Sequence, residues 1–128
     1  MNYLLLTSGI VATLATIGHF TIGNKDFLKP VINSKVDEIP KNVMQSLFHY
    51  MSVYMVLTSV ILLAFSTGNQ LIFENPTDIV KVIGFVYAGY AIVQFIIALS
   101  SKVDKGVFKM FQWVFWTLIA VFSLLSAY

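Results

Sequence analysis

Four long apolar stretches, separated by three polar connections, limit the folds open to this chain. About 20 mostly apolar residues in a helix cross the roughly 30 Å hydrocarbon core of a bilayer. Only 11% of the residues are charged, against about 25% in a soluble domain. The sequence therefore predicts an all-α membrane protein, an antiparallel bundle of four transmembrane helices forming a single domain over residues 1–128. The predicted spans cover residues 2–22, 42–66, 77–100 and 107–128.

The positions of the lysines predict how this bundle is oriented. Most lysines lie in the first connection, residues 23–41, or around the third, residues 101–106, whereas the second carries Glu74. Because positive loops stay in the cytoplasm, we expect both termini to be extracytoplasmic. No positive region precedes the first apolar run, so we interpret that run as a retained span and not as a signal peptide. We expect a multi-pass protein of the cell inner (cytoplasmic) membrane.

Composition excludes several classes of function. The chain has no cysteine, and all eight of its basic residues are lysines. Thiolate metal sites, disulfides and bidentate arginine clamps are therefore excluded. A formal net charge of +2 is too small to indicate nucleic-acid binding. The expected partners are the lipid bilayer and other membrane subunits or a second copy of the chain.

Small and polar residues share one face in each of the first three spans. Such a face is expected to turn away from lipid, toward other helices or water. In the first span the face holds Ser8, Ala12, Ala15 and His19. In the second it holds Gln45, His49, Ser52, Ser59 and Ser66, and in the third Gly84, Tyr87, Ala91, Gln94 and Ala98. In the fourth span, Trp113 and Trp116 are typical of an interfacial aromatic belt.

The only two histidines, His19 and His49, lie inside apolar runs, where an ionisable side chain indicates function. Counting 1.5 Å per residue places them roughly 5 and 10 Å below the cytoplasmic surface. Consecutive spans joined by a short connection are antiparallel neighbours, so we expect the two imidazoles to face each other. The same depth count adds a polar layer in the cytoplasmic half of the bundle, formed by Gln45, Gln94, Gln112 and Ser52.

The histidine segments carry a resemblance to a known group of proteins. Gly18-His19, Gly23 and Phe27-Leu28-Lys29-Pro30, followed by Phe48-His49 and Ser52-Val53, resemble a group of small, uncharacterised bacterial four-span membrane proteins. That group has a histidine in each of the first two spans. The resemblance covers roughly the first half of the chain, and Phe48 stands where tryptophan is expected. It implies that the two histidine segments belong together and supplies no activity.

Two cofactor hypotheses use these histidines. Two imidazoles on facing helices could ligate haem b, or they could bind a divalent metal with one or two further ligands. A metal would need a carboxylate folded back from the first connection, since the only acidic residue within a predicted span, Asp78, lies in the first turn of the third span. The competing interpretation is that both histidines are neutral and hydrogen-bonded to Gln94, Gln112 or a hydroxyl, which would hold the bundle together.

The sequence favours a non-enzymatic membrane protein. No acidic residue inside a span could orient a histidine for hydrolysis, and there is no phosphate-binding loop. The leading hypothesis is a component of a larger membrane complex or a homo-oligomer. The alternatives are a haem- or metal-binding redox protein using His19 and His49, and a small transporter or channel subunit.

Overall fold

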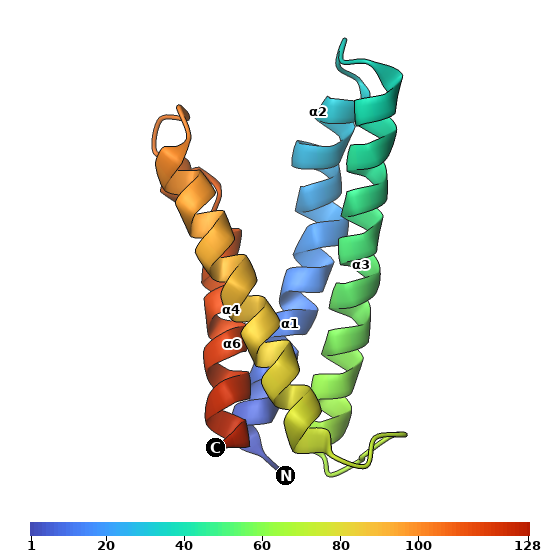
Figure 1. The fold of residues 1–128 in the computed structure, drawn as a ribbon, viewed down its shortest axis with the longest axis vertical. Helices are drawn as coiled ribbons and strands as arrows, with labels where there is room; N and C mark the ends of the chain where they lie inside the picture. The colour runs from blue at the N-terminus through green and yellow to red at the C-terminus, as the bar shows by residue number, and fades with distance from the viewer.

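The structure is a computed structural model that describes residues 1–128, and its regular elements are all helical. Three helical rods, residues 3–32, 38–66 and 76–100, are long and apolar enough to cross a membrane. The C-terminal helix, Gln112–Ala127, is also apolar but shorter (Figure 1). The elements in chain order are α1 (Tyr3–Gly18), η1 (His19–Leu28), α2 (Lys29–Ile32), α3 (Glu38–Ser66), α4 (Pro76–Ser100), α5 (Gly106–Lys109) and α6 (Gln112–Ala127).

Two helices have bounds that differ from the ends of the predicted spans. The first helix does not end at residue 22, because it continues through η1 and α2 to Ile32 and leaves only a short connection to α3. The predicted fourth span is not one helix, because the chain breaks after Lys109 and restarts as α6. The indole N–H of Trp113 donates to the Val107 carbonyl at 3.0 Å, which gives that carbonyl a partner near the break.

The rod formed by α1 and η1 is the centre of the arrangement. It packs against α3 on one side, and α1 packs against α6 on the other, while α4 packs mainly against α6. The α1–α3 and α4–α6 pairs lie close together at the end that carries both termini (Figure 1). They diverge toward the opposite end, where the connections after α2 and after α4 lie. The pairs are therefore joined along only part of their length.

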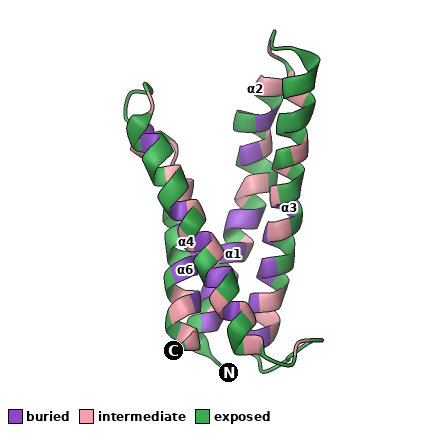
Figure 2. Ribbon diagram, in the orientation of Figure 1, coloured by how far each residue is buried: buried purple, intermediate pink, exposed green.

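Burial follows this arrangement. The small-residue stripe of the first helix is confirmed as an interior face, since Ser8, Ala12 and Ala15 are all buried. Buried residues concentrate where the two pairs meet, and the outer helix faces are exposed (Figure 2). Only 26 of the 128 residues are buried, although more than half the chain is hydrophobic. Most apolar side chains therefore point outward, as lipid-facing side chains do.

Hydroxyl pairs join the helices inside the junction. Ser8 and Ser123 link α1 to α6 with an Oγ–Oγ distance of 2.8 Å. Thr16 and Ser59 link α1 to α3 at 3.1 Å between their hydroxyl oxygens. Each such bond satisfies polar atoms that would otherwise be unpaired in an apolar interior.

Aromatic side chains close the junction between α3, α4 and α6. Tyr87 is fully buried, and its hydroxyl lies 2.8 Å from the Thr58 hydroxyl on α3. The ring centroids of Tyr87 and Trp116 are 5.6 Å apart. The expectation that Trp116 belongs to an interfacial belt is wrong, because this side chain is buried between helices. Its large apolar ring serves inter-helix packing instead.

Gly9 permits a close approach of α1 to α3. A Cβ added to Gly9 would lie 2.8 Å from Leu63 Cδ2 and 3.1 Å from the Leu63 backbone nitrogen. We expect Gly9→Ala to destabilise the protein by about 1–3 kcal/mol, because a backbone atom cannot move aside as a side chain can. Reversible unfolding in detergent would measure this change.

Gly89→Ala is the matched control, since a Cβ there meets nothing within 4 Å. It should be neutral or slightly stabilising, because alanine has the higher helix propensity. Equal destabilisation by both substitutions would contradict the assigned close approach.

Candidate functional site

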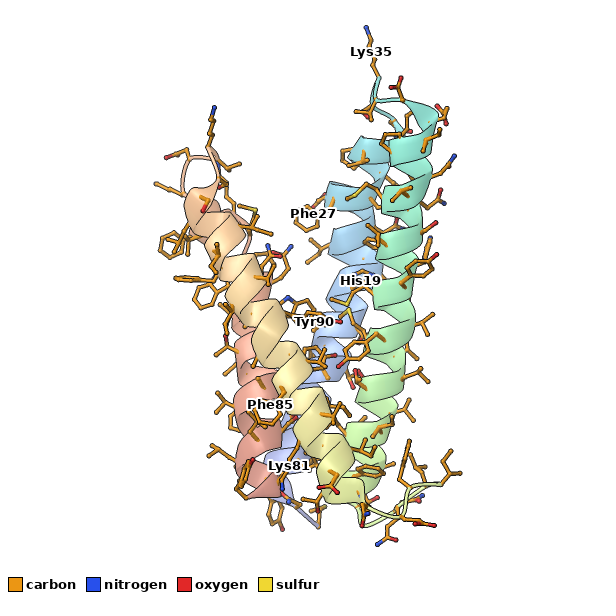
Figure 3. The ribbon with its side chains drawn as sticks, in the orientation of Figure 1. His19, Phe27, Lys35, Lys81, Phe85 and Tyr90 are labelled. Atoms are coloured by element: carbon orange, nitrogen blue, oxygen red, sulfur yellow. The ribbon has the colours of Figure 1, made fainter.

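A cavity lies between the two helix pairs, on the side where they diverge. Its volume is about 370 Å³, and its walls are mostly apolar. In Figure 3, Phe27 points from η1 toward the space between the pairs, and His19 lies nearer α3. The lining residues are Ala15, Gly18, His19, Ile22, Gly23, Phe27, Phe48, Gln94, Met110, Phe111, Gln112, Phe115 and Trp116.

The first wall of the cavity is a widened helix. From His19 to Leu28 the winding is π-helical, a form that often marks functional sites. Gly18 and Gly23 are five residues apart, the spacing of one π-type hydrogen bond. A Cβ added at Gly18 would meet nothing within 4 Å. Missing side chains on this wall therefore leave space for the cavity, and the glycine spacing is the sequence signal that could have indicated it.

The opposite wall is formed where α6 begins, directly after the helix break. Gln112 is the first residue of α6, and its side-chain Oε1 is buried without a hydrogen-bond partner. Gln94 of α4 also lines the cavity and is half-buried. Phe111, Phe115 and Trp116 add aromatic surface. The wall thus combines apolar surface with a few amide groups, as small-molecule sites do.

His19 is bound to α3. Its Nε2 lies 2.8 Å from Ser52 Oγ and 3.2 Å from the Phe48 carbonyl oxygen. The Ser52 hydroxyl itself donates to that carbonyl at 3.0 Å. A carbonyl only accepts, so this pattern assigns the proton of His19 to Nε2 and leaves Nδ1 as an acceptor. Nδ1 lies beside Gly23, within the cavity wall.

The structure does not bring the two histidines face to face. The His19 ring stacks on Phe48, with centroids 3.9 Å apart and planes 16° apart. His49 meets Phe48 edge-on at 5.6 Å, is exposed, and makes no hydrogen bond. The expectation that the imidazoles look toward each other therefore fails. The cause is rotational: adjacent residues on a helix point about 100° apart, and Phe48 takes the inward position.

The predicted polar layer divides into three parts. Ser52 is hydrogen-bonded to His19 at the interface between η1 and α3. Gln94 and Gln112 both line the cavity from the other helix pair and bond to neither histidine. Gln45 is exposed on α3. These residues share a region of the chain, but they do not form one connected layer.

The arrangement does not fit a haem between the two histidines. An axial ligand presents a free imidazole nitrogen to the iron, whereas His19 Nε2 is held by Ser52 and Phe48. His49 lies on a different, exposed part of α3. No three histidine or acidic side chains lie together, so the geometry offers no divalent-metal site of the expected composition.

The His19–Ser52 bond predicts a difference between neighbouring substitutions on α3. We expect Ser52→Ala to lower the free energy of unfolding by about 1 kcal/mol, because a partly buried imidazole loses its partner. His49→Ala should change the monomer's stability by less than about 0.5 kcal/mol, since its side chain is exposed and unbonded. Denaturant titration in detergent compares the two, and a larger loss in His49→Ala would refute the assignment.

Comparison with known proteins adds no assignment to this geometry. No family model, curated protein or solved structure matches the chain. The resemblance of its histidine segments to small four-span proteins stays a prediction.

Proposed function

We propose that the chain is a four-span antiparallel bundle of the cell inner membrane that acts, without enzymatic activity, as a component of a larger membrane complex or homo-oligomer. Seven of its eight lysines lie on the connections after α2 and α4 or on the helical segments beside them. By the positive-inside rule these connections are cytoplasmic and both termini extracytoplasmic. Residues 106–127, which include α5 and α6, supply the fourth crossing.

A stripe of exposed residues on α3 carries the proposal of assembly. We call it the α3 stripe; it consists of Asn42, Gln45, His49, Val53, Val56 and Val60. The spacing of three and four residues puts these side chains on one flank of the helix. All six are exposed, although their neighbour Ser52 is buried and hydrogen-bonded to His19 of η1. The stripe therefore borders the internal packing face without being part of it.

If the protein were alone in the bilayer, the exposure of Gln45 and His49 would cost free energy, because both residues lie at the depth of the hydrocarbon core. With 29 residues, α3 is about 43 Å long, and a helix centred on a 30 Å core leaves about four residues outside at each end. Gln45 and His49 then lie inside the hydrocarbon region. Polar groups in lipid are expensive and usually face another helix. A partner helix on the α3 stripe would cover both.

The composition of the α3 stripe also suits a helix partner. Amide and imidazole side chains form hydrogen bonds between membrane helices, and β-branched valines pack with little loss of rotamer freedom. The connections outside the helices are short, covering residues 33–37, 67–75 and 101–105. Helix faces thus supply most of the surface through which this protein could meet a partner.

Cysteine crosslinking tests the proposal cleanly, because the chain has no cysteine of its own. We expect Val53→Cys to form a disulfide-linked dimer in oxidised membranes if the partner is a second copy. Leu47→Cys, on another face of α3 and similarly exposed, is the control and should stay monomeric. Adding Gln45→Leu and His49→Leu to Val53→Cys should reduce the crosslink.

If the partner is a different subunit, the same double substitution has another consequence. A stoichiometric partner should co-purify with the unaltered chain and be lost from the Gln45→Leu, His49→Leu variant. A monomer that neither crosslinks through Val53→Cys nor carries a partner would end the proposal.

A further inference from the structure

We propose that an anionic phospholipid binds between the two helix pairs, with one acyl chain in the cavity and its phosphate group among lysines at the open end. This inference goes beyond assembly, because the cavity lies between the helix pairs whereas the α3 stripe lies on an outer flank. Lipid binding needs a membrane-spanning chain but no protein partner, so it can fail while the proposed assembly holds.

The walls of the cavity suit an acyl chain. The volume of about 370 Å³ falls within the roughly 300–1,000 Å³ of ordinary ligand sites. Apolar side chains line the cavity from both helix pairs, with Phe27 on η1, Phe48 on α3 and Phe115 on α6. Left empty, such walls would lose van der Waals contacts. In a bilayer, acyl chains are the molecules at hand to fill the space.

Access to the cavity follows from the divergence of the helix pairs. The pairs separate toward the end that carries the connections after α2 and α4 (Figure 1). Phe27 points into the intervening space from η1 (Figure 3). An acyl chain can therefore enter sideways from the leaflet at this end, while its headgroup stays near the level of the connections.

Lysines border the open end of the cavity. Residues 25–29 on one helix pair and residues 102–109 on the other together hold five lysines and two aspartates. All five lysines are exposed, and none forms an ion pair, since the only salt bridge joins Lys41 to Glu38. A surplus of positive charge therefore remains at this end. We call these residues the rim lysines; they are Lys25, Lys29, Lys102, Lys105 and Lys109.

The rim lysines belong to the same chain segments as the cavity walls. Lys29 lies two residues after Phe27, and Lys109 directly precedes Met110, which also lines the cavity. A lysine can lay its methylene groups along apolar surface while its ammonium group reaches the polar interface. Basic pockets between membrane helices bind anionic lipid headgroups. A phosphate at the open end would lie between lysine-bearing segments of both helix pairs.

The charge at the open end, and not the apolar wall, selects the lipid. Lipid tails are as apolar as the wall, so the cavity alone accepts the chain of any phospholipid. The ammonium groups favour a headgroup with net negative charge over a zwitterionic one, which carries its own positive charge. We therefore expect phosphatidylglycerol to be preferred over phosphatidylcholine with identical acyl chains.

These two phospholipids, each with brominated chains, form a matched pair of probes in vesicles of unbrominated phosphatidylcholine. Bromine quenches tryptophan, and Trp116 is buried and lines the cavity. The Trp113→Phe variant leaves Trp116 as the only tryptophan. We expect half-maximal quenching at a mole fraction about 10-fold lower for phosphatidylglycerol than for phosphatidylcholine. Thermal stability of the unaltered chain in detergent, raised more by phosphatidylglycerol, measures the same preference without the tryptophan change.

A pair of glycine variants separates a lipid in the cavity from lipids around the protein. Gly18 lines the cavity, and a Cβ added there meets nothing within 4 Å, so Gly18→Leu should occupy the space of the chain. We expect it to weaken quenching by both lipids and to abolish the preference. Gly89→Leu is equally unobstructed but outside the cavity, and it should behave as the unaltered glycine does.

Lysine variants test the headgroup separately from the chain. Replacing Lys29, Lys105 and Lys109 together with glutamine should remove the preference and leave quenching by phosphatidylcholine unchanged. Lys81→Gln, at the opposite end of the protein, is the control and should keep the preference. Equal quenching by the two lipids before any lysine is changed, or a preference that survives in Gly18→Leu or in the triple lysine variant, would overturn the proposal.

Discussion

The close contact of α1 with two other helices is the interaction on which this structure depends. Ser8, Ala12 and Ala15 present almost no side-chain bulk, so α1 can lie between α3 and α6. Gly9 brings its backbone close to Leu63. Within lipid, burial of apolar surface does not drive helices together, so close packing and hydroxyl pairs such as Ser8–Ser123 must hold them. Without α1, α3 would have little contact with α4 and α6.

Because the helix pairs are in contact along only part of their length, polar groups inside and beyond this junction have different hydrogen-bond partners. Where the helices are packed, hydroxyls pair within the interior, as Thr58 does with Tyr87. Where the pairs diverge, His19 is hydrogen-bonded to α3, while Gln112 lines the cavity with its Oε1 buried and unpaired. His49, only one residue from Phe48, lies outside on the α3 stripe. The inner cavity therefore follows from the splayed arrangement, whereas the exposure of His49 follows from its rotational position on α3.

Sequence periodicity located the inner faces of the first and third spans, but on the second span only Ser52, Ser59 and Ser66 of the predicted face are buried, and Gln45 and His49 are exposed. The faces containing Ala12 and Tyr87 were predicted from spacing alone and are buried. The pairing of His19 with His49 was not recovered, because depth along a helix says nothing about rotation around its axis. The cavity was missed because it needs a widened turn at η1 and a break before Gln112, two departures from regular geometry. The five-residue spacing of Gly18 and Gly23 was the one sequence feature that indicated the cavity.

Hydropathy and residue spacing by themselves determined the helical class, the long apolar rods and the faces that turn inward. These properties are local, since each depends on residues a few positions apart along one helix. Only the tertiary structure decided which helices touch, where they separate and which polar atoms remain unpaired. The physical reason is that packing depends on how surfaces from distant segments fit, and a rotation of one residue exchanges an inward Phe48 for an outward His49.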